Sequence, residues 1–382
     1  MLLTFTQPPS APKRAHAKGF ILALTLWIIA LFGLGIAAIS TWIGVATENA
    51  RTLRSRVDDE IALSNAKSEL IFALATRPMT YRGLEVGIAV DQPVEGDKKN
   101  APVDTFMAMS NAMQETSRVI AFDRRPYVME NNRDYIIQIQ DGRGLINLNR
   151  IQPPLLRRLL ALYDTSEALR SQLPDTLQDW VDEDEFTRLA GAEKPDYDQL
   201  RRLPPTNARL TTPMEAQNIL GWDQVPRIWE DDLKAPIFST CTTAGFNPNT
   251  APEASLIVHT PGLTEDAAKF IVERRQAGSF RHAREFLELA NISVPNEAFF
   301  FGTSPGSCMV IDFVNRTTAE RTRISLTLVP RGQNQPWQVD YAFRIPSLQS
   351  GTLDGLDPQL TFPTPETLTS SSDGHLTAIG IR

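Results

Sequence analysis

The feature that most constrains this chain is an apolar, uncharged stretch near its N-terminus. Residues 20–47 contain no Asp, Glu, Lys or Arg and are rich in Ile, Leu and Ala. About 20 apolar residues are enough for a helix to cross the hydrocarbon core of a bilayer. A secretory signal has an apolar core of only about 7–15 residues. The stretch is therefore too long for such a signal, and we expect one membrane-spanning helix.

A short basic leader precedes the apolar stretch and ends on a small residue. It contains no acid and three basic residues, Lys13, Arg14 and Lys18. A peptidase that cuts between Gly19 and Phe20 would leave the apolar helix on the mature protein, which is the layout of a type IV prepilin. An uncleaved single-span anchor is the alternative. Basic residues also follow the span, so the positive-inside rule does not settle the orientation, and the prepilin layout alone places the N-terminus in the cytoplasm.

Composition narrows the classes of function. The 382 residues carry a net charge of −7, and an acidic protein repels a polyphosphate, so nucleic acid is not an expected partner. No two of the four histidines have zinc-ligand spacing, and there is no Gly-rich phosphate loop, so we expect no enzyme. Cys241 and Cys308 could form a disulfide in an oxidising compartment, and two separate buried thiols are the alternative.

Hydrophobic periodicity divides the remaining chain. Residues 135–139 and 145–149 flank Asp141-Gly142 and predict a β-hairpin, and further strands are expected at 309–314, 323–329 and 338–343. A helical period dominates between these strands. The expected organisation is a leader (1–19), a transmembrane and spine helix (20–80), the first half of an α/β part (81–152), an inserted helical domain (153–295), the second half of the sheet (296–350) and a flexible C-terminal tail (351–382).

Several motifs occur in an order that resembles one known family. They are Lys18-Gly19-Phe20, Asp141-Gly142-Arg143-Gly144-Leu145-Ile146-Asn147-Leu148-Asn149, Asp179-Trp180-Val181-Asp182-Glu183-Asp184, Gly191-Ala192-Glu193 with Tyr197, and Asn249-Thr250-Ala251-Pro252 before Pro261-Gly262-Leu263. Over residues 18–330 the chain resembles the minor pseudopilin K family of type II secretion systems (general secretion pathway protein K). The resemblance implies an α+β fold: a pilin-like long N-terminal helix packed on an antiparallel sheet, with an inserted all-α domain of helix-hairpin-helix or SAM-like type.

The resemblance also implies a function. It implies a minor pseudopilin that caps the tip of a periplasmic pseudopilus and helps to initiate its assembly for protein export. The implied partners are minor pseudopilins I and J, other pseudopilins, the inner-membrane assembly platform and a prepilin peptidase. The implied location is the bacterial inner membrane, with a single pass and the C-terminal body in the periplasm. Type IV pilins usually have glutamate as the fifth mature residue, but counted from Phe20 that residue is Leu24, which favours the tip.

An acidic cluster is the candidate metal site. Its members are Asp179, Asp182, Asp184 and Glu193. Converging carboxylate oxygens suit Ca²⁺, which takes about 6–8 oxygen ligands. The spacing of an EF-hand is missing, and a solvated acidic loop is the alternative. The resemblance implies calcium binding in this region.

Residues 249–289 read as a helix-hairpin-helix repeat, which leaves a second function open. Such hairpins hold DNA through the backbone N–H groups of a Gly-x-Gly turn. Here Thr264 replaces the second glycine, and Glu265 and Asp266 stand where phosphate would approach. We therefore expect the helices of this repeat to pack within the protein and not to bind DNA. The alternative function is a membrane-anchored DNA-binding protein of competence type, which a gel shift with duplex DNA would reveal.

Overall fold

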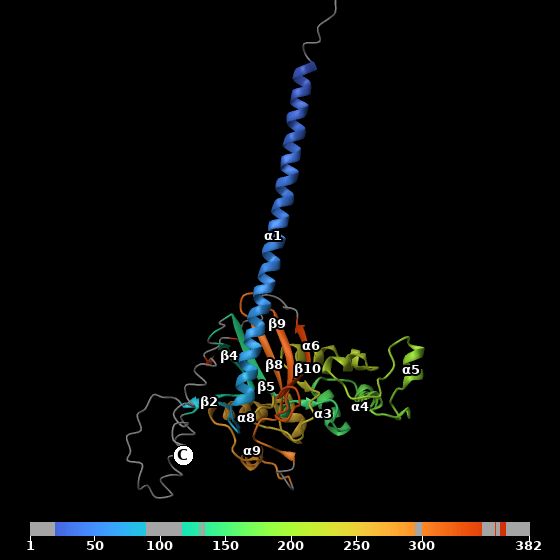
Figure 1. Ribbon diagram of the computed structural model, residues 1–382. Coiled ribbons are helices and arrows are strands. Elements are labelled where there is room, and N and C mark those ends of the chain that lie inside the picture. Colours follow the sequence, from blue (N-terminus) through green and yellow to red (C-terminus); the bar gives the residue numbers. More distant parts are fainter. Residues whose placement is uncertain are drawn as a thin grey trace, which may run out of the picture. The chain divides into compact units, whose positions relative to one another are not determined.

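The computed structural model describes residues 20–88, 117–129, 131, 134–294, 300–345, 356 and 360–363. The chain divides into two compact units, Met1–Ala62 and Leu63–Arg382. The helix α1 (Phe20–Thr76) begins in the first unit and ends in the second (Figure 1). It ends close to the predicted boundary because Pro78 follows, and the residue before a proline avoids helical backbone angles.

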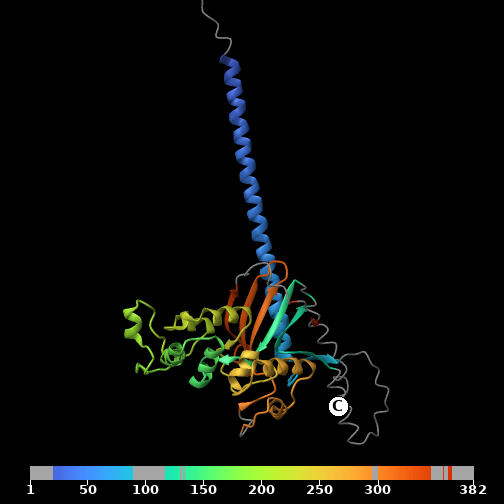
Figure 2. The same ribbon diagram turned by 180° about the vertical axis from the view of Figure 1, so that it is seen from behind.

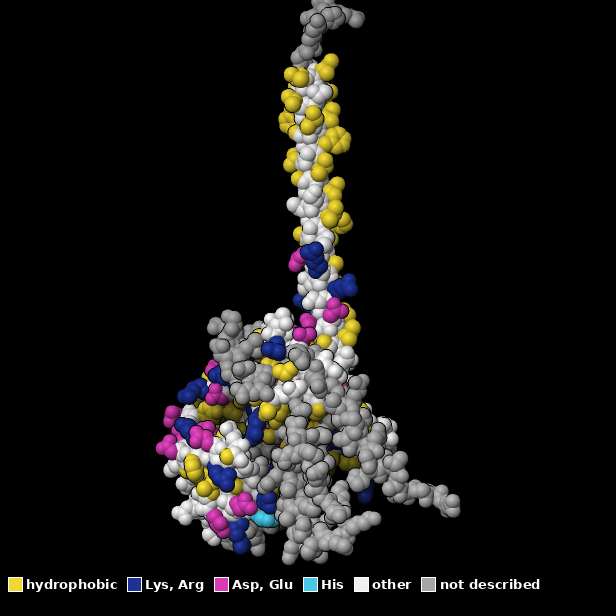
Figure 3. All heavy atoms as spheres, turned by 90° about the vertical axis from the view of Figure 1, so that its left-hand side faces the viewer, with side chains coloured by type: hydrophobic (Ala, Val, Ile, Leu, Met, Phe, Trp, Pro, Cys, Tyr) yellow, Lys and Arg dark blue, Asp and Glu magenta, His cyan; other side chains and the backbone are white. Residues whose placement is uncertain are grey.

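In the first unit α1 is apolar and exposed along the predicted span. Figure 3 shows apolar side chains along this part of the helix, followed by charged side chains further along it. The first charged residues after Phe20 include Glu48 and Arg51, which form an ion pair at 3.8 Å. Among the residues that the structure describes, α1 is the helix whose length and composition would allow it to cross a membrane.

In the second unit the last turns of α1 pack into the body. Leu63, Ala66, Leu70, Ala73 and Leu74 recur at a spacing of three or four residues and are buried. This spacing places them on one face of the helix. The turns lie against the main sheet in both ribbon views (Figures 1 and 2).

The main sheet has six strands in the order β10-β9-β8-β5-β4-β11. Its members are β4 (Asp123–Met129), β5 (Tyr135–Asp141), β8 (Cys308–Asn315), β9 (Arg321–Leu328), β10 (Trp337–Ile345) and β11 (Leu360–Phe362). Neighbouring strands are antiparallel, except that β11 runs parallel to β4. The central strands β5 and β8 are buried along their whole length. The predicted strands at 309–314, 323–329 and 338–343 are all present.

The structure differs from the prediction in the C-terminal stretch. The sequence analysis expected a flexible tail over 351–382, but Leu360–Phe362 form β11 and pair with Tyr127–Met129. Phe362 is buried, which gives this short strand an apolar contact with the body. The rest of the expected tail, apart from residues 356 and 363, lies outside the described residues.

The predicted hairpin over 135–149 is wrong. β5 is followed by a turn of 3₁₀ helix, η1 (Gly142–Gly144), and then by β6 (Ile146–Asn147). β6 pairs in parallel with β7 (Phe238–Ser239), whereas β5 pairs with β4 and β8. The carboxylate of Asp141 accepts a hydrogen bond from the Arg143 N–H and so caps η1. Both halves form strands, but they do not pair with each other: β5 lies between β4 and β8, and β6 pairs with β7.

A small second sheet joins the end of α1 to the main sheet. It consists of β1 (Met79–Thr80), β2 (Gly83–Ile88) and β3 (Ser117–Ile120), in that order. Gly83 has a φ of +132°, and a Cβ there would lie 2.1 Å from the carbonyl oxygen of Ile120. Only glycine therefore allows β2 and β3 to approach.

The helical part lies between β5 and β8, which are neighbours in the sheet. It comprises α3 (Pro153–Leu162), α4 (Glu167–Val181), α5 (Lys194–Gln199), η2 (Pro213–Asn218), η3 (Trp222–Gln224), α6 (Pro226–Lys234), α7 (Glu253–His259), α8 (Glu265–Ala277) and α9 (Ala283–Leu289). It has two hydrophobic cores. One contains Trp180, Trp222 and Trp229, and the other contains Phe246 and Phe286.

Candidate functional site

The acidic cluster begins at the end of α4 and continues through residues 182–193, which we call the acidic loop. Asp179 is fully buried, and its two oxygens accept from the Arg188 side chain at 2.6 Å and the Arg188 N–H at 3.1 Å. The same guanidinium pairs with one oxygen of Asp182. Gly191 permits this packing, since a Cβ there would lie 1.8 Å from an oxygen of Asp179.

Glu193 faces the same cluster without a partner. Its side chain is 2% exposed, and neither carboxylate oxygen makes a hydrogen bond; Oδ1 of Asp182 is likewise buried and unpaired. Burial raises the pKa of Glu193 to about 7, and the nearby charges of Asp179, Asp182 and Asp184 act in the same direction. The site therefore holds more negative charge than one guanidinium balances.

The four predicted ligands are not equivalent in the structure. Asp184 is exposed, and its Oδ1 accepts from the Phe186 N–H at 2.9 Å. Within the described part of the chain, no three acidic, His or Cys side chains are arranged to hold a metal ion. The sequence analysis missed Arg188, which occupies the centre of the cluster. A basic residue within an acidic run could have indicated that Arg188 pairs with these carboxylates.

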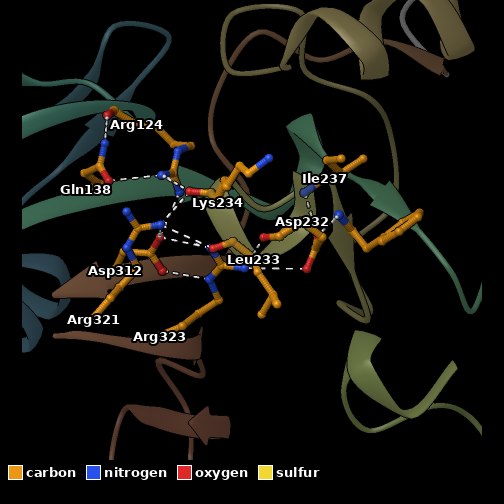
Figure 4. A network of polar contacts seen from close by, with 10 residues as sticks. Arg124, Gln138, Asp232, Leu233, Lys234, Ile237, Asp312, Arg321 and Arg323 are labelled. Carbon is orange, nitrogen blue, oxygen red and sulfur yellow. Dashed lines mark hydrogen bonds and ion pairs between the residues drawn. The ribbon is translucent and has the colours of Figure 1, made fainter. Parts of the chain in front are cut away.

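A second charged cluster joins the helical part to the sheet (Figure 4). We call it the junction network; its charged members are Arg124, Asp232, Asp312, Arg321 and Arg323. Arg323 binds both oxygens of Asp312, at 2.7 and 3.1 Å, and Arg124 binds Oδ2 at 2.9 Å. Asp312 lies in the middle of β8, and Arg323 lies opposite it on β9.

The junction network also holds the C-terminus of α6. Arg323 donates to the carbonyl oxygens of Asp232 and Leu233, at 2.6 and 3.2 Å, and Arg124 donates to that of Lys234 at 3.2 Å. The last carbonyls of a helix have no partner within the helix and carry a partial negative charge, so cations stabilise them. Arg124 reaches this position because it has a φ of +70° at a bulge between β4 and β5.

The electrostatics of the two junction carboxylates differ. Burial alone would raise the pKa of Asp312, but Arg323 and Arg124 outweigh it and hold the pKa well below its usual range. Burial raises the pKa of Asp232, and Arg323 and the N–H groups of Phe238 and Ile237 offset only part of this effect. Asp312 is therefore the ionised centre of the network.

A third cluster lies where β5 ends and β8 begins. Asp141 is buried and accepts from the Gly306 N–H, the Asn247 side chain and the Thr250 hydroxyl, at 2.9, 2.8 and 3.0 Å. Cys241 and Cys308, the two cysteines paired in the sequence analysis, form a disulfide next to it. These contacts hold the start and the end of the helical part together.

One basic side chain of the helix-hairpin-helix region is buried and bonds within the protein. Arg275 is buried and donates to the carbonyl oxygens of Pro248 and Ala251, at 2.8 and 2.6 Å. Thr264 caps α8 by accepting from the Ala267 N–H at 3.2 Å. His259 stacks on Phe246 with ring centroids 4.3 Å apart. These contacts stabilise the second core, and Arg275 is not available to a phosphate.

These features define a class: an α+β protein in which a long, apolar N-terminal helix precedes a sheet with a helical insertion between its central strands. The family model described as type II secretion system (T2SS), protein K, matches residues 139–226, so this region belongs to that family, as the sequence analysis predicted. The matched region runs from β5 to the start of α6 and includes the acidic cluster.

The chain is also similar to a chain of known structure. A chain in the crystal structure of the GspK-GspI-GspJ complex from the enterotoxigenic Escherichia coli type 2 secretion system is 14% identical in sequence. The match covers 77% of this chain and 99% of that chain, with a TM-score of 0.44. No curated protein matches the chain.

Proposed function

We propose that this protein is a minor pseudopilin of a type II secretion system and acts by binding other proteins. The match of residues 139–226 to the protein K family carries the proposal. The apolar part of α1 supports a single pass through the bacterial inner membrane. The Cys241–Cys308 disulfide supports a periplasmic location for the body, because disulfides persist in oxidising compartments. A prepilin peptidase and the inner-membrane assembly platform are proposed partners.

The mature protein is expected to begin at Phe20. Gly19 is a small residue at the edge of an apolar helix that stays on the protein after cleavage. N-terminal sequencing of protein purified from membranes tests this. Gly19→Leu places a bulky residue at the cut and is expected to leave the chain starting at Met1. A wild-type chain that starts at Met1, or beyond Thr47, would contradict the prediction.

Within the secretion filament we propose the tip position, with minor pseudopilins I and J as neighbours. The solved complex contains GspK with GspI and GspJ, which suggests this set of partners. Leu24 stands where a pilin usually has glutamate, so the chain lacks the carboxylate that would pair with the amine of a subunit already in place. Such a subunit is suited to be laid down first and to initiate assembly.

Gold labelling of assembled filaments is expected to show this protein at one end only. An epitope inserted at Asn334, in the exposed turn between β9 and β10, would leave the sheet intact. The same epitope on a shaft-forming pseudopilin is the matched control and should label the whole filament. Labels along the whole shaft from the Asn334 insertion would exclude a tip position.

We also propose that the acidic cluster binds calcium through Asp179, Asp182, Asp184 and Glu193, with backbone carbonyls completing the shell. Both oxygens of Glu193 and one of Asp182 are buried without hydrogen-bond partners, so they are free to serve as cation ligands. Bound calcium would supply the positive charge that this cluster lacks. In the absence of the metal, Arg188 supplies part of that charge.

A further inference from the structure

Arg188 satisfies only half of the buried carboxylate oxygens in the acidic cluster. Its side chain and its N–H bind both oxygens of Asp179 and one oxygen of Asp182. The other oxygen of Asp182 and both oxygens of Glu193 are buried and have no partner. A buried charged group without a partner costs free energy, so the cluster is only partly satisfied by Arg188.

In the acidic loop Arg188 makes the ion pairs with Asp179 and Asp182, whereas Ala192 packs into a hydrophobic core and the Ala190 N–H donates to Asp175. The neighbouring apolar side chains, Phe186 and Leu189, are 82% and 104% exposed, so they do not anchor the loop. The Arg188 side chain itself is 37% exposed, and solvent therefore reaches one side of its ion pairs. Moving this side chain outward would break its two ion pairs without disturbing a hydrophobic core.

We propose that Arg188 is a tethered counter-cation that a divalent cation displaces, and that Arg188 thereby sets the affinity of the cluster for the metal. This inference rests on the proposed calcium site. A divalent cation and the guanidinium compete for the same oxygens of Asp179 and Asp182. The cation can in addition take the unpaired oxygens, because Ca²⁺ accepts about 6–8 oxygen ligands.

Removing the competitor should strengthen metal binding and weaken the metal-free protein. In a chelating buffer Arg188→Gln leaves Asp179, Asp182 and Glu193 without a counter-charge, so its Tm should fall below that of the wild type. In excess CaCl₂ the metal supplies the counter-charge in both proteins and displaces Arg188 from the wild type, so the two Tm values should coincide. The Kd of the variant for Ca²⁺ should be at least about tenfold lower.

The experiment uses the full mature chain in detergent, with calorimetric titration of CaCl₂ and thermal melts in CaCl₂ or EGTA. Arg202→Gln is the matched control, because Arg202 pairs with Asp223 at 2.9 Å elsewhere in the helical part and makes no contact with the cluster. Its Kd for Ca²⁺ should equal that of the wild type. Arg188→Lys keeps the charge but cannot form the same pair of contacts, so its affinity should lie between those of the wild type and Arg188→Gln.

The outcomes separate this inference from the site on which it rests. If the wild type and Arg188→Gln bind Ca²⁺ equally and the Tm deficit persists in CaCl₂, Arg188 is a structural residue and the inference fails while the calcium site stands. If none of the proteins binds Ca²⁺, both proposals fail. Binding by Arg188→Gln but not by the wild type supports the inference. Should Arg188→Gln not fold, an Arg188→Lys affinity at or below the wild-type value overturns it.

Discussion

Asp312→Asn is expected to lower the free energy of unfolding by about 3–5 kcal/mol, because it removes the negative centre of a buried ion network. Arg323 is almost fully buried and binds both Asp312 oxygens, and Arg124 binds one of them. In the variant these guanidinium groups keep their charge but lose their counter-charge. The same groups hold the last carbonyls of α6, so the helical part should loosen from the sheet.

Urea unfolding followed by tryptophan fluorescence measures this loss, since Trp229 lies in α6. Asp134→Asn is the matched control: Asp134 is exposed just before β5, and its change should stay within about 0.5 kcal/mol. A loss below about 1 kcal/mol in Asp312→Asn would mean that the network contributes little.

The pH dependence of the difference between wild type and Asp312→Asn has a definite sign. Arg323 and Arg124 hold the pKa of Asp312 below its usual range. A carboxylate with a lowered pKa stabilises the folded state above its ordinary pKa of about 4, and this contribution is lost as the pH falls towards the folded-state value. The stability difference should therefore be constant from pH 7 to about pH 4 and shrink only in stronger acid.

The sequence predicted those parts of the fold in which local pattern and final environment agree. The uncharged run after Gly19 became α1, and the apolar alternation around Ile311 and Ile324 became β8 and β9. The predicted hairpin after Tyr135 was wrong because there the local pattern and the final pairing of the strands disagree. Apolar and polar residues alternate in both halves, as in strands. However, Asp141 caps a 3₁₀ turn between them, and Ile146 pairs with Phe238, far along the chain.

The candidate sites were also predicted only in part. Asp179 and Asp182 share the guanidinium of Arg188, and their charges act on Glu193, but Arg188 was missed because only the carboxylates were considered. The junction network was missed entirely. Arg124 and Asp312 are 188 residues apart, and only the fold brings them together. An aspartate within the apolar run at 309–314 was the signal, because a charge in a buried strand requires a partner.

Removing the Cys241–Cys308 disulfide is expected to lower the free energy of unfolding by about 4 kcal/mol. The bond joins residues separated by 67 positions, and closing so long a loop reduces the conformational entropy of the unfolded chain. It also fastens the segment between β7 and α7, inside the helical part, to the first residue of β8. The double variant Cys241→Ala/Cys308→Ala keeps the site apolar, so the loss reports the cross-link.

Urea unfolding with and without dithiothreitol measures this effect. Dithiothreitol should destabilise the wild type towards the stability of the double variant and should leave the double variant unchanged, which makes the variant its own control. Non-reducing peptide mapping of protein from the native host should recover Cys241 and Cys308 in one cross-linked peptide pair. Two free thiols there would contradict the pairing, and they would also remove the support that the disulfide gives to a periplasmic body.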